Sequence, residues 1–234
     1  MPYFPMFYID KYYLLLVIPA FIFTIIAQAK VKSTYNNYAK YYARCGETAS
    51  QVCRRILDDN GLHNIAIGRV SGELTDHYDP KNNIINLSDS TYDSTSIAAI
   101  GVAAHEAGHA CQHADEYFPI KLRMAIIPVT NFASTAAPWL LIAGLIFSFQ
   151  FLIDIGIIFF GASVIFQLVT LPVEYNASSR ALKTLQAEGI MDGEELAGTK
   201  KVLNAAALTY LAALCLAVAS FLRVVLLFGN RRRR

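Results

Sequence analysis

The sequence predicts a mostly α-helical membrane protein with about four transmembrane helices and a small α+β domain outside the bilayer. Of the 234 residues, 55% are hydrophobic and only 16% are charged, and the mean hydropathy is +0.38. This composition is too apolar for an ordinary soluble domain. Because a bilayer core needs roughly 20 apolar residues in a helix, four stretches qualify as spans: 12–29, 133–153, 155–173 and 205–228.

The first span resembles a signal peptide, because Lys11 precedes its apolar run and Ala27-Gln28-Ala29 ends it. We predict an uncleaved membrane anchor instead, since Asp10 offsets Lys11 and the run is long enough to cross the bilayer. The second and third spans are separated only by Asp154, with Gly156 nearby, which predicts a tight helical hairpin. The fourth carries Arg223 near its end, where a long side chain can reach the interface.

The basic residues near the spans predict the orientation, because cytoplasmic loops are enriched in Lys and Arg. With four spans, nearly all of them fall on one side: Lys30, Lys32, Lys40, Lys121, Arg123, Arg180, Lys183, Lys200 and Lys201. The tail 231–234 (Arg-Arg-Arg-Arg) is the exception, so the last segment either fails to cross or places its tail outside. We expect a multi-pass protein of the cell (plasma) membrane with its polar domain in the cytosol.

Two further observations concern partners and compartment. The formal net charge of +2 gives no support for nucleic-acid binding. The four cysteines form no C-x-x-C pair, and Cys45 and Cys53 would lie about 12 Å apart along a helix, too far to bridge. Reduced thiols agree with a cytosolic location of the polar domain. Oligomeric state is not predictable from these features.

Composition divides the chain into five segments. The predicted segments are a membrane anchor (1–29), the small α+β domain (30–132), a transmembrane hairpin (133–173), a helical insert (174–204), and a last membrane helix with a basic tail (205–234). Within 30–132, apolar residues recur at helical spacing from about Glu47 to Asp59, and Gly61 follows as a C-terminal cap. Runs of β-branched residues at 65–67 and 84–88, with turn-forming residues at 79–83 between them, predict a short β-hairpin. Asp93 or Ser94 can cap a helix that reaches about Ala114.

The motif His105-Glu106-Ala107-Gly108-His109 lies inside this last helix. Residues four apart on a helix project side by side, so His105 and His109 can bind one metal ion, and imidazole suits zinc. Glu106 is rotated away from the ion but can reach a water that zinc activates, as its general base. Small neighbours, including Gly108, would let another backbone approach closely. Together these features predict Zn²⁺ as the cofactor.

A catalytic zinc site needs a third protein ligand. His113 is excluded, because it would lie about 12 Å along the axis from His105 and be rotated by about 80°. The acidic residues downstream are Asp115, Glu116, Asp154, Glu174, Glu188, Asp192, Glu194 and Glu195. Glu174 stands out because it follows Pro172-Val173 at the end of a span, where an acid is costly unless it is paired or metal-bound. Alternatively, it is a carboxylate at a helix start beside Pro172.

The run "SGELTDHYDPKNNIINLSDSTYDSTSIAAIGVAAHEAGHACQHADEYFPIKLR", followed by "LPVEYNASSRAL", resembles the YugP-like family of neutral zinc metallopeptidases of bacterial membranes. The resemblance implies a zincin-like catalytic domain in which His105, His109 and Glu174 bind zinc and Glu106 is catalytic. A more distant similarity is to the HtpX and CAAX prenyl protease gluzincins. Those proteins have an acidic residue four positions after the glutamate that corresponds to Glu174, where this chain has Ser178.

The stretch "LTDHYDP" also belongs to the family pattern. One interpretation is that His77 or Tyr78 polarises the substrate carbonyl and that the hairpin edge accepts the substrate as an added strand. The other is a turn stabilised by Asp76 and Asp79. The sequence therefore predicts a zinc-dependent endopeptidase (hydrolase) embedded in the membrane, which cuts protein or peptide substrates near the bilayer.

Two alternatives to this function remain. In a site-2-type intramembrane protease the zinc helix itself would lie in the bilayer, but residues 94–114 contain many polar side chains and Asp192-Gly193 lacks the Asn-Pro context of that family. In a non-catalytic zinc-binding membrane adaptor, Glu106 would have no purpose.

Overall fold

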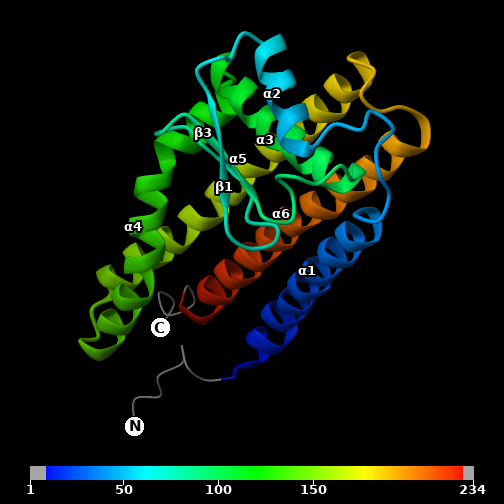
Figure 1. The fold of residues 1–234 in the computed structure, drawn as a ribbon. Coiled ribbons are helices and arrows are strands. Elements are labelled where there is room, and N and C mark those ends of the chain that lie inside the picture. Colours follow the sequence, from blue (N-terminus) through cyan, green and yellow to red (C-terminus); the bar gives the residue numbers. More distant parts are fainter. Residues whose placement is uncertain (1–8, 229–234) are drawn as a thin grey trace. The chain divides into compact units, whose positions relative to one another are not determined.

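The computed structural model describes residues 9–228, which form long helices and one small sheet (Figure 1). A π-helical turn (η1, Tyr13–Val17) leads into α1 (Ile18–Tyr38). The remaining elements follow in the order α2 (Ala49–Asp59), β1 (Ala66–Val70), β2 (His77–Asp79), β3 (Ile84–Ser88), α3 (Ile97–Ala114), α4 (Phe118–Ile146), α5 (Gln150–Ala187) and α6 (Gly193–Phe228). The protein is therefore mostly α-helical, as predicted.

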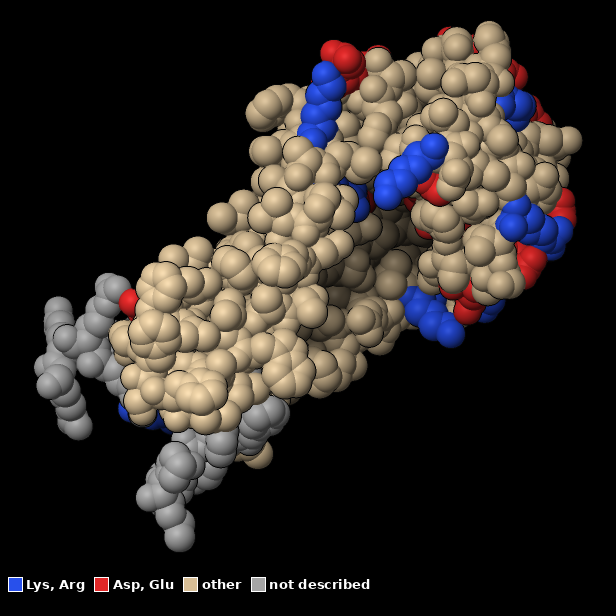
Figure 2. All heavy atoms as spheres, turned by 90° about the vertical axis from the view of Figure 1, so that its left-hand side faces the viewer, with Lys and Arg blue, Asp and Glu red and all other residues tan. Residues whose placement is uncertain are grey.

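Four helical segments within the described residues are long and apolar enough to cross a membrane: Tyr13–Tyr38, Phe118–Ile146, Gln150–Ala187 and Gly193–Phe228. This confirms the prediction of a mostly α membrane protein with about four spans. On the face drawn in Figure 2, a broad surface carries almost no Lys, Arg, Asp or Glu. Such a surface agrees with contact with lipid.

The predicted break of the transmembrane hairpin at Asp154 is wrong, because the chain turns at residues 147–149. Ser148 adopts a left-handed conformation (φ 52°), and the Phe149 N–H bonds to the Gly144 carbonyl at 2.9 Å. This is the hydrogen-bond pattern of a Schellman C-cap, in which glycine is usual but not required. Asp154 lies near the start of α5, where its carboxylate accepts a hydrogen bond from Gln150 Nε2 at 3.0 Å. An acid close to a helix N-terminus is favourable and need not end the helix.

The described chain forms two compact units. Unit 1 contains residues up to 28, then 122–171 and the chain from 209 onward, whereas unit 2 contains 29–121 and 172–208. The core of unit 1 includes Leu141, Ile153, Val224 and Phe228. Arg223 does not simply reach the interface, because its guanidinium forms an ion pair with Asp10 at 2.8 Å. The basic tail 231–234 lies outside the described residues.

In unit 2, α2 packs on α3 and begins with a capping box between Thr48 and Gln51. The helix ends as predicted, with Asn60 as its C-cap and Gly61 in the left-handed region (φ 72°). The N-cap of α3 is Ser96, not Asp93 or Ser94, since the Ser96 hydroxyl accepts the Ala99 N–H at 3.2 Å.

The sheet has the strand order β1-β3-β2. A hairpin is present, but it joins β2 and β3 in antiparallel register, with His77 opposite Asn86. The expected pairing of residues 65–67 with 84–88 as a hairpin is wrong, because β1 runs parallel to β3. Parallel strands need a connection of about a dozen residues, and residues 71–83, which contain β2, provide it. Ile85 and Leu87 of β3 are fully buried in the core that also holds α2 and α3.

Candidate metal centre

Three side chains from α3 and α5 converge in unit 2. His105 Nε2 lies 3.3 Å from Glu174 Oε2, and His109 Nε2 lies 3.4 Å from the same oxygen. The two imidazole rings are neighbours, with centroids 4.7 Å apart. These residues form a cluster whose potential ligand atoms all lie within 4.8 Å of one another. They are positioned to bind a metal ion.

The spacing suits zinc. With bonds of about 2.0 to 2.1 Å and tetrahedral angles, two ligand atoms lie roughly 3.3 Å apart. The two nitrogen–oxygen distances, 3.3 and 3.4 Å, have this value. Two imidazoles and one carboxylate are also the donor set of several catalytic zinc sites, which leave the fourth position open. The residues present therefore fit the ion.

Glu174 lies inside α5 and not at a helix start, so the alternative role beside Pro172 does not apply. Its side chain is almost fully buried, with 2% exposure. Burial of a carboxylate is costly unless a charge or hydrogen-bond donor compensates it. The two histidines supply this compensation, and a cation would supply more.

A glycine permits α3 and α5 to approach. A Cβ atom built on Gly108 would lie 2.8 Å from the Ala177 carbonyl oxygen, which belongs to the backbone of α5. Gly108 occupies the motif position before His109, and Ala177 follows Glu174 by three residues. The small residue predicted to admit a neighbouring backbone therefore brings the Glu174 carboxylate to the two histidines.

We expect Gly108→Ala to weaken zinc binding by about tenfold or more and to lower stability by about 1–3 kcal/mol, because the added methyl must push the two helices apart. Zinc affinity is measured by competition with a chromogenic chelator, and stability by thermal unfolding. Gly161→Ala is the matched control, since its Cβ would meet only the Phe221 ring at 3.4 Å. Wild-type zinc affinity in Gly108→Ala would contradict this account of the packing.

The other ring nitrogen of each histidine has its own partner. His105 Nδ1 lies 3.1 Å from the Ser178 hydroxyl, and His109 Nδ1 lies 3.0 Å from Gln112 Oε1. An N–H at Nδ1 that donates to these oxygens leaves the lone pair on Nε2, which faces Glu174. Partners of this kind fix the tautomer and the ring orientation of metal-binding histidines.

Gln112 links the histidine to α5. Its side chain is fully buried, and Nε2 donates to the Val173 carbonyl at 2.8 Å and to Asn176 Oδ1 at 2.9 Å. Arg180 also donates to Asn176 Oδ1, at 2.9 Å, and pairs with Asp115. A buried amide whose hydrogen bonds are satisfied in this way holds α3 and α5 in one register.

Protonation of the site is influenced by its acids. Burial alone would lower the pKa of His109, but the hydrogen bond and charge of Glu174 and the charge of Glu106 together raise it above its ordinary value. When the ring is protonated, a metal ion must displace the proton on Nε2 before it binds. Metal binding therefore releases protons, as is general for histidine ligands.

Glu106 faces the sheet. Its side chain is buried, and Oε2 accepts the backbone N–H of Tyr78 on β2 at 2.9 Å. The Tyr78 ring packs edge-on against His113, with centroids 5.4 Å apart. His113 is not part of the ligand cluster, in agreement with its helical spacing.

His77 is not brought to the cluster. Its Nδ1 lies 2.9 Å from the Thr75 carbonyl oxygen and its Nε2 lies 3.2 Å from Asn86 Nδ2, on an exposed part of the sheet. Asp76 and Asp79 stabilise the adjacent turns, because Asp76 accepts from Ser88 and Asp79 accepts from Lys81 and Asn82. In the stretch "LTDHYDP" it is thus the Tyr78 backbone that approaches Glu106.

Several of these contacts were not predicted from the sequence. Ser178 stands at the position where more distant gluzincins have an acid, and its hydroxyl nevertheless reaches His105. Gln112, three residues after His109, follows the i, i+3 geometry of a helix and could have been found by that spacing. The Tyr78 contact depends on the pairing of β2 and had no sequence signal.

The fold and the cluster together define a helical membrane protein with a three-residue site suited to zinc. The chain belongs to the family described as "Putative neutral zinc metallopeptidase", whose model matches residues 13–229. It is 47% identical over 220 residues to the "Putative membrane protease YugP" of Bacillus subtilis (strain 168). The aligned residues make up 94% of this chain and 98% of that protein. No solved structure matches the chain.

Proposed function

We propose that the protein is a zinc-dependent endopeptidase embedded in the membrane, in which His105, His109 and Glu174 hold the ion and Glu106 is the general base. The observation that carries this proposal is the convergence of His105 Nε2 and His109 Nε2 on Glu174 Oε2 at zinc-ligand spacing, with a second carboxylate, that of Glu106, close enough for its charge to act on His109. The similarity to a Bacillus subtilis protein named as a membrane protease supports the same reaction.

Zinc, when bound, supplies Lewis acidity that polarises a carbonyl group and makes water a stronger nucleophile at neutral pH. The Tyr78 N–H holds Glu106 Oε2 in place, so that the carboxylate accepts a proton from the attacking water as the new carbon–oxygen bond forms. Glu106 then returns this proton to the amide nitrogen as the carbon–nitrogen bond breaks. Glu106 thus both accepts and returns the proton, and no second acid or base is needed.

The role considered for His77 or Tyr78 in polarising the substrate carbonyl stays a prediction, and the geometry favours the Tyr78 position. Strand β2 is an edge of the sheet, and Tyr78 contacts both Glu106 and His113. An extended peptide laid along this edge would present its backbone beside Glu106. We propose that substrates are unfolded protein segments close to the membrane.

Metal removal tests the reaction. The purified full-length protein should carry about one zinc ion per chain and should cleave an unfolded protein substrate. A strong chelator should reduce cleavage to background, and added zinc should restore it, as measured by gel and mass spectrometry. Stoichiometric zinc without cleavage of any of a broad panel of unfolded substrates would favour the non-catalytic adaptor instead.

We propose further that unit 2 faces the cytosol, on the strength of the basic residues that flank the spans. Lys81 lies in the exposed turn between β2 and β3. A Lys81→Cys variant should therefore react with a membrane-impermeant maleimide in permeabilised cells but not in intact ones. Labelling of intact cells to the same extent as permeabilised cells would place unit 2 on the outer side of the membrane.

A further inference from the structure

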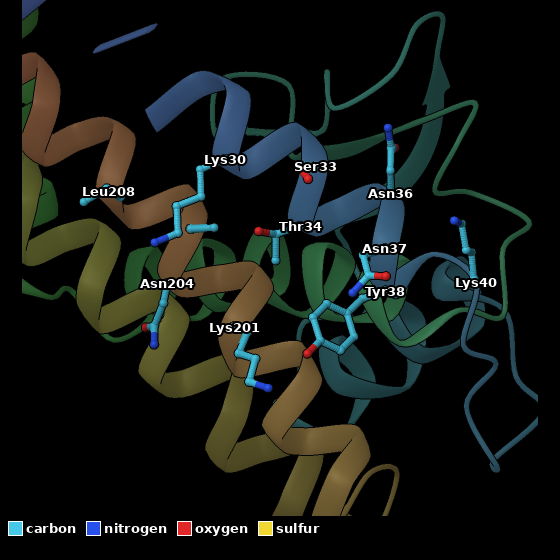
Figure 3. Close-up of a pocket in the computed structure, with 11 residues that line it drawn as sticks. Lys30, Ser33, Thr34, Asn36, Asn37, Tyr38, Lys40, Lys201, Asn204 and Leu208 are labelled. Carbon is cyan, nitrogen blue, oxygen red and sulfur yellow. The ribbon is translucent and has the colours of Figure 1, made fainter. Parts of the chain in front are cut away.

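A polar groove in unit 2 runs between α1 and α6, apart from the metal centre. It has a volume of about 830 Å³ and is lined by Lys30, Thr34, Asn37 and Tyr38 of α1 and by Lys201 and Asn204 of α6, among others. In Figure 3, Lys30 extends from α1 toward α6, and the Tyr38 hydroxyl points toward Lys201. The volume lies in the range of small-molecule sites.

The groove is positively charged. Lys30, Lys40 and Lys201 line it, and no Asp or Glu does. Within residues 9–228 none of these three ammonium groups forms an ion pair, whereas the neighbouring Lys32 pairs with Glu73 at 3.4 Å. The Lys201 ammonium lies 5.8 Å from the centre of the Tyr38 ring, which orients it without neutralising it. Hydroxyl and amide groups, among them those of Thr34, Asn37 and Asn204, also line the groove, so the donors suit an anion with several oxygens.

The groove occurs where the apolar composition of both helices ends. Lys30 directly follows the apolar run 12–29, and Asn204 directly precedes the run 205–228. Lysines at such positions lie at the level of the lipid headgroups. Basic pockets between membrane helices at this level are suited to anionic headgroups.

We propose that this groove binds the phosphate group of an anionic lipid headgroup, with Lys30 and Lys201 as the charged partners and Thr34, Asn37 and Asn204 as hydrogen-bonding partners. The chemistry that is recognised is phosphate, which a soluble phosphate compound could also offer. The proposal is independent of the peptidase reaction, because none of these residues contacts the metal centre.

The test uses the purified full-length protein in detergent micelles, with bound lipid counted by native mass spectrometry. Phosphatidylglycerol and phosphatidylcholine are titrated in separate arms, and inorganic phosphate is added as a competitor in a third. The variant is Lys30→Gln with Lys201→Gln. The matched control is Lys32→Gln with Lys200→Gln, which removes the same charge from the same two helices outside the groove.

We expect phosphatidylglycerol to bind the wild type in preference to phosphatidylcholine, and the groove variant, which lacks two lysines, to bind it about 30-fold more weakly, while the control binds as the wild type does. Competition by millimolar inorganic phosphate, with loss of that competition in the groove variant, would support the phosphate site and assign it to a soluble source. The proposal would be overturned if the groove variant and the control lost phosphatidylglycerol binding to the same extent. It would also be overturned if the wild type showed no preference between the two lipids and inorganic phosphate had no effect on binding.

Discussion

Glu106→Gln is expected to reduce peptide hydrolysis by about 10²- to 10⁴-fold, the usual contribution of a general base, while it leaves bound zinc unchanged. The glutamine side chain has the shape of glutamate, and its carbonyl oxygen can still accept the Tyr78 N–H. It cannot take a proton from water. Cleavage of an unfolded substrate and zinc content by mass spectrometry are measured on the same preparation.

Glu116→Gln provides the control for this substitution, because Glu116 is exposed and pairs only with Lys121 at the surface. It should retain wild-type activity. Full proteolysis by the Glu106→Gln protein would exclude the proposed general base even if the metal site were intact.

Glu174→Gln is expected to weaken zinc binding by more than about 100-fold, because removal of a ligand should exceed the 10- to 100-fold effect typical of outer-shell partners. At limiting zinc, peptide hydrolysis should fall in proportion to the amount of zinc bound. Zinc affinity is measured by chelator competition, and thermal unfolding without metal shows whether the buried site still folds. Ser178→Ala, which removes only the partner of His105, should give an intermediate loss.

Glu194→Gln is the control for Glu174→Gln, since Glu194 is exposed in the first turn of α6. If the Glu174→Gln protein bound zinc as tightly as the wild type, the third ligand would have to be another residue. The Glu106→Gln and Glu174→Gln experiments distinguish the general base from the metal site. The first substitution is expected to reduce hydrolysis with bound zinc unchanged, and the second to weaken zinc binding itself.

The sequence predicted the features that depend on local spacing. The length of the apolar runs predicted the spans, and helical periodicity predicted α2. The four-residue separation of His105 and His109 predicted that they face one ion. The break of the hairpin was misplaced, because Asp154 suggested a turn whereas the hydrogen bonds around Ser148 form it without glycine or proline. A single exposed serine in a turn of this kind has no strong composition signal.

Features that depend on packing could not be predicted in the same way. The pairing of β1 with β3 is parallel because residues 71–83 allow a crossover, and alternation of side chains does not distinguish this from a hairpin. Ser178 becomes a partner of His105 only when Gly108 brings α3 against Ala177. The prediction of Glu174 as the third ligand came from its position beside a span and from the family resemblance, and the structure supplies the distances that make it the candidate.

Unit 2 is assembled from two stretches of chain, 29–121 and 172–208. During synthesis, His109 therefore leaves the ribosome 174 − 109 = 65 residues ahead of Glu174. At roughly 5–20 residues per second, about 3–13 s pass between them. In that interval all of α4 and the apolar part of α5 are made. The nascent chain has no complete cluster of the three side chains until its membrane hairpin has been made, so the order of translation sets the earliest time at which the proposed metal centre can assemble.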